Sequence, residues 1–495
     1  MKVKRLHLQN YGRFEDLNID FAPTTKKTSN VTVIVGNNGA GKSQILQALA
    51  TSLSWLIVEF ENESHEGEFL KQSIIKNNSD NTEINITLGN LSSTSNDNNW
   101  KNDELSAAWK ISASRGKKLS PAVYGIDDNG LSELVNNYRK IFNEDQNASL
   151  PILAFYPVDR VVNAAHMEIN DSSTSNQLAA YDNALAISTG FESLFSWFRE
   201  REDIENEKNI DLRSLSKDDS TLLDSLEREF KLTKLNTSKV LTEDEKESMV
   251  MQVVLNFKKS LYSQIENSFY DKMLTSVRKS INFFTNFTNP RIRRQGTPTM
   301  IVEKDGEELD VNQLSQGEKS LLALVGDIAR RLALLNPSLE NPLEGEGVVM
   351  IDEVDLHLHP KWQHDLIDKL VTTFPNVQFI LTTHSPHVIS DRNDILLYSL
   401  DDGELTEMPN VYGEDANTVL TKIFDVDIRD SKVEEQFNVI RRAISKHDYI
   451  TAENCITELA EKLPSDHLEL LKCRLLLAQS KLANNHKDES SHAED

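Results

Sequence analysis

The chain has 495 residues, enough for roughly two or three domains, and carries a formal net charge of −25. This charge excludes a protein whose whole surface attracts nucleic acid, so contact with DNA would need a local basic patch. Cys455 and Cys473 form no C-x-x-C pair, which argues against a zinc knuckle or disulfide framework and favours a cytoplasmic location. The first residues are typical of a strand, not of a signal peptide, and no apolar run reaches the roughly 18 residues of a membrane span.

The first predicted elements are a strand pair, Val3–Leu8 and Leu17–Phe21. A buried strand, Val31–Val35, and a helix, Ser43–Ser54, are predicted next. Between them stands the sequence GNNGAGKS, residues 36–43, with the G-x-x-x-x-G-K-S spacing of a phosphate-binding loop. A chance glycine turn is the alternative, but the strand before the loop and the helix after it favour the phosphate-binding interpretation.

In such a loop, glycines let backbone N–H groups wrap a polyphosphate, and the helix N-terminus adds partial positive charge. Lys42 would reach the β- and γ-phosphates, and the Ser43 hydroxyl would be a ligand of Mg²⁺. The residues predicted to bind the nucleotide in this loop are Gly36, Asn37, Asn38, Gly39, Ala40, Gly41, Lys42, Ser43 and Gln44.

Further strands are predicted at Glu83–Leu88, Trp109–Ser112 and Leu153–Val158. From Leu185 to about Phe287 helix formers dominate, but no heptad is sustained over three or four repeats, which disfavours a long coiled coil. Strands and helices then alternate, which implies a parallel sheet. These later elements are Thr299–Glu303, Glu308–Val311, the helix Leu314–Leu335, Val348–Ile351, the helix Lys361–Thr373, Val377–Leu381 and the hairpin Ile395–Leu400 with Glu404–Met408.

The predicted fold is therefore α/β, with an N-terminal antiparallel subdomain, a parallel core sheet, an inserted helical lobe and a C-terminal helical region. Two halves of one nucleotide-binding domain would be separated by the lobe and followed by a partner-binding region and a disordered tail. The predicted boundaries are 1–184 and 291–411 for the two halves, 185–290 for the lobe, 412–482 for the partner-binding region and 483–495 for the tail.

Two acids follow the predicted strand Val348–Ile351. At the strand's end, the carboxylate of Asp352 could hold Mg²⁺ through water, and Glu353 would act as the base that orients or deprotonates attacking water. The alternative is a buried strand that happens to end in two surface acids. The phosphate loop upstream makes the catalytic interpretation the stronger one.

Residues 314–320 read LSQGEKS at the start of a helix. Ser315 and the Gly317 backbone would form a second anion site at this helix N-terminus, and Glu318 is included among the predicted nucleotide-binding residues. An ordinary capped helix is the alternative, because Ser315 and Glu318 have the spacing of a capping box. The other motifs in the chain favour the functional interpretation.

Two further motifs follow the paired acids. Asp355 is interpreted as an interface residue that couples two active sites, while a metal site at His357 and His359 is disfavoured because no cysteine or third histidine is near. His384 follows the predicted strand Val377–Leu381, at the sheet edge where ligands bind in open α/β folds. Its imidazole could donate to the γ-phosphate. A lone histidine is more often structural, but the place of His384 after a buried strand, in the order of the other motifs, favours the functional interpretation.

These motifs occur in the order seen in ABC-type ATPases, and the chain resembles their soluble SMC-like and overcoming-lysogenization-type branch. The stretches EVDLHLHP, TTHSP and LHLQNYGRFEDLNIDF carry the resemblance. The length, the helical insert and the segment VYGEDANTVL are most similar to PtuA-type ATPase subunits of Septu anti-phage systems, including their retron-associated relatives. The resemblance implies ATP and Mg²⁺ as cofactors.

It also implies head-to-tail dimers, with ATP between Lys42 of one protomer and Ser315 of the other, and higher-order assemblies such as hexamers. The implied partners are an HNH-type nuclease of the PtuB kind and a retron reverse transcriptase with its msDNA. The chain departs from the family at the Q-loop, where no glutamine is well placed and Asp159 and Arg160 are weak substitutes. Arg13 is a further candidate for contact with phosphates or ribose.

Three functions compete. A self-contained nuclease would need a Toprim domain, and the only Asp-x-Asp after His384, Asp425-Val-Asp427, is predicted to be a turn. A DNA-repair or chromosome-structuring ATPase usually needs a long coiled coil. The sequence therefore favours an ATPase that regulates a separate nuclease through its C-terminal helices. These helices carry apolar residues at helical spacing: Val433, Phe437, Ile440 and Ile444, then Ile456, Leu459 and Leu463, then Leu468, Leu471 and Leu475. Packing on the chain's own core would explain most of these residues.

Overall fold

The computed structural model describes residues 1–61, 67–89, 106–116, 124–127, 130–161, 176–186, 189–210, 270–296, 298–390, 392–424, 431–464 and 466–491. The chain divides into two compact units, Met1–Glu414 and Asp415–Asp495. Among the described helices, none combines the length and the apolar character that a membrane crossing requires.

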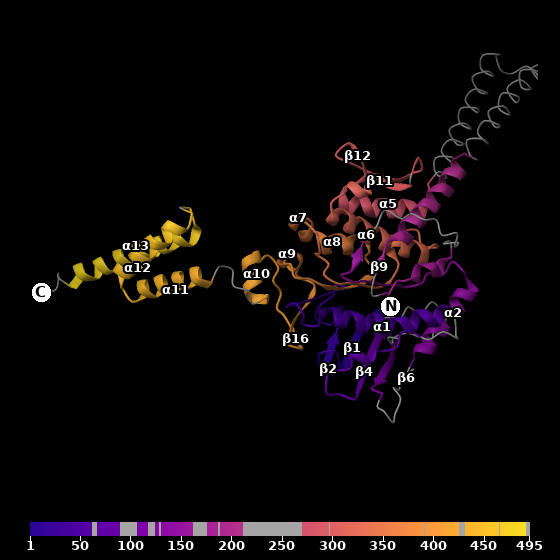
Figure 1. Cartoon of the computed structure of the whole chain (residues 1–495), viewed down its shortest axis with the longest axis horizontal. Helices are drawn as coiled ribbons and strands as arrows, with labels where there is room; N and C mark the ends of the chain where they lie inside the picture. Colours follow the sequence, from indigo (N-terminus) through magenta and orange to yellow (C-terminus); the bar gives the residue numbers. More distant parts are fainter. Residues whose placement is uncertain are drawn as a thin grey trace, which may run out of the picture. The chain divides into compact units, whose positions relative to one another are not determined.

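An antiparallel sheet forms one layer of the first unit. Its strands, in spatial order, are β2 (Phe14–Asp20), β1 (Lys2–Tyr11), β4 (Asn81–Gly89), β5 (Ala107–Ser114) and β6 (Tyr124–Asp127). Alternate side chains of β4 and β5 are buried, as expected for a sheet that packs on the core with one face. The long helix α1 (Lys42–Glu61) lies between this sheet and the core sheet, and α2 (Leu131–Glu144) packs beside it (Figure 1).

The core sheet has six strands and brings the candidate residues to one edge. Its order is β16 (Glu404–Glu407), β15 (Leu396–Asp401), β3 (Val31–Gly36), β14 (Val377–Thr382), β13 (Gly347–Ile351) and β7 (Ile152–Tyr156). All neighbours pair in parallel except β15 and β16. Strands β3, β7, β13 and β14 are buried along their whole length, as expected for a parallel sheet covered on both faces.

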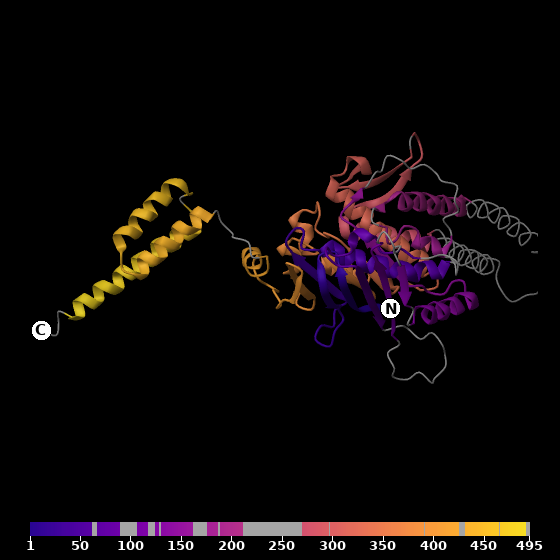
Figure 2. The same ribbon diagram turned by 60° about the horizontal axis from the view of Figure 1, so that its bottom comes forward.

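Helices cover the other face of the core sheet. Helix α6 (Gln316–Leu335) packs on β7 and against α5 (Lys272–Thr285), and α5 also contacts α8 (Leu366–Thr373) (Figure 2). A small antiparallel sheet precedes α6 in the chain. Its strands are β10 (Thr288–Arg293), β11 (Thr299–Lys304) and β12 (Glu307–Asp310), and the shortest remaining strands are β8 (Arg160–Val161) and β9 (Thr189–Gly190).

The predicted α/β fold, with its antiparallel subdomain and parallel core, is confirmed by this topology. The helix predicted over Lys361–Thr373 is instead two short helices, α7 (Pro360–His364) and α8 (Leu366–Thr373), separated at Asp365. Of the predicted helical lobe, residues 192–210 and α5 are helical, and residues 211–269 lie outside the described part of the chain. A one-turn helix, α9 (Pro386–Ile389), follows the core strand β14.

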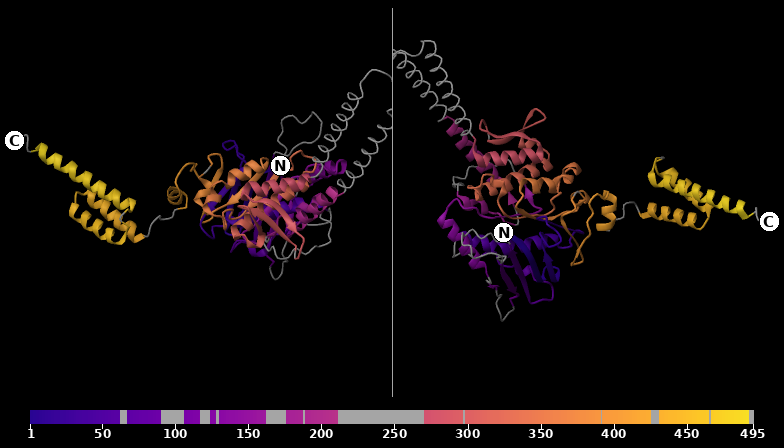
Figure 3. Two further views of the ribbon diagram at one scale, coloured as in Figure 1. Left: turned by 90° about the horizontal axis from the view of Figure 1, so that it is seen from above. Right: turned by 180° about the vertical axis from the view of Figure 1, so that it is seen from behind.

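The second unit is helical. It contains α10 (Ala416–Ile423), α11 (Ser431–Ser445), α12 (Tyr449–Lys462) and α13 (Leu468–Ser491). Helices α11, α12 and α13 lie side by side (Figure 3) around a core that includes Phe437, Ile440, Leu459 and Leu470. Helix α13 continues to Ser491 and so includes residues 483–491 of the segment that the sequence predicts as a tail.

Candidate active site

The phosphate-loop sequence connects β3 to α1 in the predicted way. Gly41 adopts a φ of +109°, and a Cβ there would lie 2.6 Å from Cζ of Phe14, so only glycine fits. Within the described residues, the backbone N–H groups of Gly41, Lys42 and Ser43 donate to no protein acceptor. At the apex Asn37, Asn38 and Gly39 are exposed, and Ala40 is buried. The loop thus presents free donors at a helix N-terminus, the arrangement that holds an anion.

Lys42 is buried at this loop and reaches across to another strand end. Its ammonium donates to the carbonyls of Gly36 at 2.9 Å and Asn37 at 3.2 Å, and lies 2.8 Å from Nε2 of His384. Since an ammonium can only donate, Nε2 accepts and the imidazole is neutral. Burial lowers the pKa of Lys42, while Asp352 and neighbouring acids oppose the change. Burial and then the charge of Lys42 lower the pKa of His384.

The paired acids stand at the end of β13, beside the end of β14. Thr382 donates its hydroxyl to Oδ1 of Asp352 at 2.5 Å and accepts from the N–H of Glu353 at 2.7 Å. Glu353 adopts a φ of +44°, a left-handed conformation that a residue with a side chain seldom occupies. Such strain persists only where the surroundings hold it, and it is common at active sites.

Arg160 supplies much of that restraint. Its guanidinium is buried and donates to the carbonyls of Asp352 at 2.6 Å, Glu353 at 2.7 Å and Pro157 at 3.1 Å. Burial lowers the pKa of Arg160, and Asp352 and the neighbouring acids counteract this. Sequence reasoning treated Arg160 as a weak substitute for a Q-loop glutamine. In the structure it contacts the backbone of Asp352 and Glu353 instead, and no local motif predicts these contacts.

Asp355 is tied to the residues that precede His384. Its Oδ1 accepts from the hydroxyl of Thr383 at 2.5 Å and from the N–H of His384 at 3.4 Å. His359 caps α7 by accepting from the N–H of Lys361. In the described part of the chain there is no cluster of three or more potential metal-binding side chains.

The LSQGE segment forms the N-terminus of α6 and lies apart from the phosphate loop. Ser315 is exposed and forms a capping box with Glu318, whose carboxylate also pairs with Lys304 at 2.6 Å. Gly317 packs so closely on the loop after β13 that a Cβ would lie 2.2 Å from the carbonyl oxygen of His357. Within the described residues, no hydrogen bond or ion pair joins these residues to Lys42.

Arg13, in the turn between β1 and β2, contacts the phosphate loop directly. Its guanidinium donates to the carbonyl of Gly39 and lies 3.9 Å from the carboxylate of Asp402. The side-chain oxygen of Gln44 accepts from the N–H of Arg13 at 3.4 Å. The structure therefore brings Arg13 and Gln44 together beside the loop, while no contact distinguishes a phosphate-binding from a ribose-binding role.

A buried charge cluster links α6 to the catalytic strands, and sequence reasoning missed it. Asp327 pairs with Arg330 and Arg331 at 2.7 Å each and accepts from the Tyr156 hydroxyl at 2.9 Å. Burial alone would raise the pKa of Asp327, but the two arginines outweigh it and hold this pKa well below its usual range. The carbonyl of Tyr156 accepts from the N–H of Asp352, so α6 connects to the acids through two hydrogen bonds.

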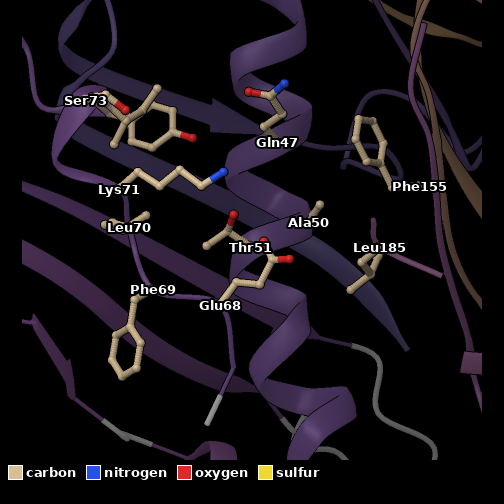
Figure 4. Close-up of a pocket in the computed structure, with 12 residues that line it drawn as sticks. Gln47, Ala50, Thr51, Glu68, Phe69, Leu70, Lys71, Ser73, Phe155 and Leu185 are labelled. Atoms are coloured by element: carbon tan, nitrogen blue, oxygen red, sulfur yellow. The ribbon is translucent and has the colours of Figure 1, made fainter. Parts of the chain in front are cut away.

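A separate cavity of about 200 Å³ lies along another part of α1 (Figure 4). Its lining includes Gln47 and Thr51 of α1, Lys71 from the segment after α1, and Phe155 and Leu185. None of the predicted nucleotide-binding or catalytic residues lines it. The candidate active site is therefore the open sheet edge around Lys42, and this cavity is not part of it.

Comparisons with known proteins identify relatives of this chain. The model of the AAA ATPase domain family matches residues 1–389. The protein named "Retron Ec83 probable ATPase" from Escherichia coli is 34% identical over 448 residues, covering 86% of this chain and 76% of that protein. The "Septu protein PtuA" of Bacillus thuringiensis is 31% identical over 141 residues, covering 27% of this chain and 36% of that protein.

Among solved structures, the Smc head domain of Pyrococcus furiosus is similar with 16% identity and a TM-score of 0.40, covering 82% of this chain and 96% of that chain. The family match covers most of the chain and includes the phosphate loop, the paired acids and His384. The chain therefore belongs to the AAA ATPase domain family and is an ATPase related to the retron ATPases and to the Septu protein PtuA.

Proposed function

We propose that this ATPase binds ATP with Mg²⁺ at the sheet edge formed by β3, β13 and β14, and that its nucleotide state regulates a nuclease in anti-phage defence. The main support for ATP hydrolysis at this edge is that Lys42, Glu353 and His384 lie close together. They come from three separate strand ends, and an ammonium and an imidazole already meet at 2.8 Å. Lys42 and the loop N–H groups would hold the β- and γ-phosphates.

The donor set suits Mg²⁺. Mg²⁺ keeps several waters and takes one or two protein oxygens together with substrate phosphates, so it needs no dedicated protein cage. The Ser43 hydroxyl and the Asp352 carboxylate would supply those oxygens. The hydrogen bond from Thr382 fixes the orientation of the Asp352 carboxylate, as the surroundings of a metal ligand usually do. When bound, the ion would neutralise charge on the phosphates.

Glu353 would act as the general base toward the attacking water. The hydroxyl of Thr382 accepts from the backbone N–H of Glu353, and Arg160 donates to the Glu353 backbone carbonyl. These two hydrogen bonds fix the position of the backbone from which the Glu353 side chain extends. The neutral His384 would orient toward the γ-phosphate through its ring N–H after Lys42 moves to the phosphates. Arg160 is then a positioning residue, because its guanidinium donates to the backbone carbonyls of Asp352 and Glu353 and to that of its neighbour Pro157.

A complete site would need a second protomer. Ser315 is exposed at the N-terminus of α6 and makes no hydrogen bond or ion pair with the phosphate loop of its own chain in the described residues. In a head-to-tail dimer, Ser315 and the α6 N-terminus would instead face the phosphates bound by the partner's Lys42. Asp355 would then connect the two sites, since it bonds to Thr383 and His384 of its own chain.

The defence role is supported by the relatives, whose printed names place them with retrons and with Septu. A nuclease supplied by another chain is supported by the described residues themselves, which contain no acidic metal-binding cluster of the kind a self-contained nuclease needs. We propose an HNH-type nuclease of the PtuB kind as this partner. Residues 415–495 would hold it, because they form a compact unit downstream of every ATPase motif.

The test compares the full chain with a chain that ends at Glu414, each co-expressed with a PtuB-type HNH nuclease. We expect the shortened chain to bind ATP with unchanged affinity and to lose the nuclease on co-purification. Metal-dependent DNA cleavage by the full chain alone would contradict the proposal and favour a self-contained nuclease. Retention of the nuclease by the shortened chain would place its binding surface on the ATPase unit instead.

A further inference from the structure

Helix α13 carries apolar residues on two faces, and the unit's own core uses only one of them. Leu470, Cys473 and Leu477 are buried against α11 and α12. A second row of leucines points away from this core. Its exposed fractions are 65% for Leu468, 44% for Leu471, 60% for Leu475 and 62% for Leu482. A contiguous exposed apolar row marks an interaction surface, whereas single exposed apolar residues are ordinary.

The spacing of this second row is regular. Leu468, Leu471, Leu475, Ala478 and Leu482 follow one another at alternating steps of three and four residues, the a and d positions of a coiled coil. We call these five residues the α13 seam. Knobs-into-holes packing at such spacing takes one further helix, so the seam is suited to a helix and not to a flat surface or a sheet edge.

The residues beside the seam carry positive charge. Lys472 occupies an e position, and Arg474 and Lys481 occupy g positions. Lys472 pairs with Glu469 at 2.9 Å and Lys481 with Glu453 at 2.5 Å, while Arg474 has no ion pair among the described residues. Both pairs are exposed, and exposed pairs of this kind contribute little and exchange readily for a partner's acids.

This charge pattern argues against a second copy of α13 as the occupant. In a parallel pair, g positions face the partner's e positions, and in an antiparallel pair e faces e and g faces g. An antiparallel pair would set basic g positions opposite one another, and a parallel pair would set Arg474 opposite Gln479, so neither arrangement offers these residues an acidic partner.

We propose that the α13 seam binds an amphipathic helix with acidic flanking residues, supplied by the partner protein. The proposal deepens the proposed function, because it rests on residues 415–495 holding a partner and names the chemistry by which they do so. Leucine contacts would provide most of the affinity, and the basic flanks would select an acidic helix over a neutral or basic one.

Two synthetic helical peptides test the proposal on the full chain by fluorescence anisotropy. Both have Leu at their a and d positions, one with Glu and the other with Lys at e and g. We expect the acidic peptide to bind and its affinity to fall as salt is raised, and the basic peptide to bind at least about tenfold more weakly. Equal binding of the two, or no binding of the acidic peptide, would overturn the proposal.

Substitutions test whether the acidic peptide binds at the α13 seam. L471E combined with L475E should weaken the acidic peptide more than about tenfold, whereas I450E, at a 74% exposed position of α12, should leave it unchanged. R474E should weaken the acidic peptide and strengthen the basic one, an exchange that misfolding cannot produce. All three variant chains should hydrolyse ATP at the parent rate. A loss of peptide binding can therefore be distinguished from an error in the assignment of the catalytic residues.

The mass of the full chain in solution tests the alternative that the α13 seam binds a second copy of α13. If α13 pairs with a second copy, L471E with L475E will halve the mass of an assembly that the parent chain forms without ATP. That result would overturn the proposal in favour of self-association. An unchanged mass, together with loss of peptide binding, would support a partner helix as the occupant.

Discussion

The ammonium of Lys42 lies 2.8 Å from Nε2 of His384, although 342 positions separate the two residues in the sequence. Lys42 begins α1 after β3, and His384 follows β14, the strand that pairs with β3 in parallel. Parallel pairing brings the carboxyl ends of both strands to the same edge, where the acids after β13 also lie. This edge is where each mutational prediction for the active site applies.

Replacing Lys42 by alanine should weaken ATP binding by roughly 10- to 100-fold, the usual worth of a charge-assisted hydrogen bond to phosphate. Calorimetry with ATP and Mg²⁺ measures the change. K71A is a matched control, because Lys71 lies in the cavity lining and outside the candidate site. Unchanged ATP affinity in K42A would remove this lysine from the phosphate site.

Replacing Glu353 by glutamine should leave ATP binding intact and slow hydrolysis by about 10²–10⁴, because a positioned general base contributes that much. Phosphate release under saturating ATP is the measurement, and E340Q, at an exposed position, is the control. If the turnover of E353Q equals that of the parent, Glu353 is not the base and the acid pair serves only the metal.

Replacing Arg160 by alanine should lower kcat by roughly 10- to 100-fold with little change in KM for ATP, since a small displacement of a catalytic group has such an effect. The guanidinium contacts the carbonyls of Asp352 and Glu353 and thereby positions the base. Lysine at this position should restore the activity only partly, because one ammonium cannot match the fork of donors. A raised KM with unchanged kcat would instead show that Arg160 contacts the nucleotide.

Replacing Asp327 by asparagine should lower the free energy of unfolding by about 3–5 kcal/mol, because Arg330 and Arg331 would keep their charges without a buried partner. Urea unfolding at neutral pH measures this loss. D368N, which alters an exposed pair with Arg392, should cost less than about 1 kcal/mol.

The same substitution has a pH signature. The pKa of Asp327 is lower in the folded chain than in the unfolded one, so its contribution is fully present above the ordinary carboxyl pKa of about 3.9. That contribution is lost as the pH falls below this value toward the folded pKa. The stability difference between parent and D327N should therefore shrink in acid, and a constant difference would contradict the ion-pair explanation.

Local patterns predicted the strand ends and their site residues, because the chemistry of Lys42, Asp352 and His384 follows directly from short motifs on buried strands. They did not predict the contacts of Arg160 with Asp352 and Glu353, since these two acceptors are backbone carbonyls more than 190 positions away and carry no side-chain signal. Asp327 was missed for a related reason. Asp327 precedes Arg330 by three residues and Arg331 by four, a spacing that is also common on the solvent-exposed surface of a helix. The contact with Tyr156 distinguishes the buried cluster from such a surface arrangement, and that contact is tertiary.

Helical periodicity had a similar limit in the second unit. It identified the row Leu468, Leu471 and Leu475 as one face of a helix, and most apolar residues there were expected to pack on the chain's own core. The structure buries Leu470 and Leu477 and leaves that row exposed. Period alone gives the faces of a helix, whereas the neighbouring helices decide which face is covered.

The central claim is that ATP is hydrolysed in a site built from two protomers, and mixing two inactive chains tests it most directly. K42A and S315R chains should each be inactive alone. In a mixed dimer one site carries both substitutions and the other carries neither, so equal mixing should restore roughly a quarter of the parent rate, since half of the dimers are mixed and each has one intact site. No recovery, with mixed dimers shown to form by native mass, would contradict the account and place the whole site within one chain.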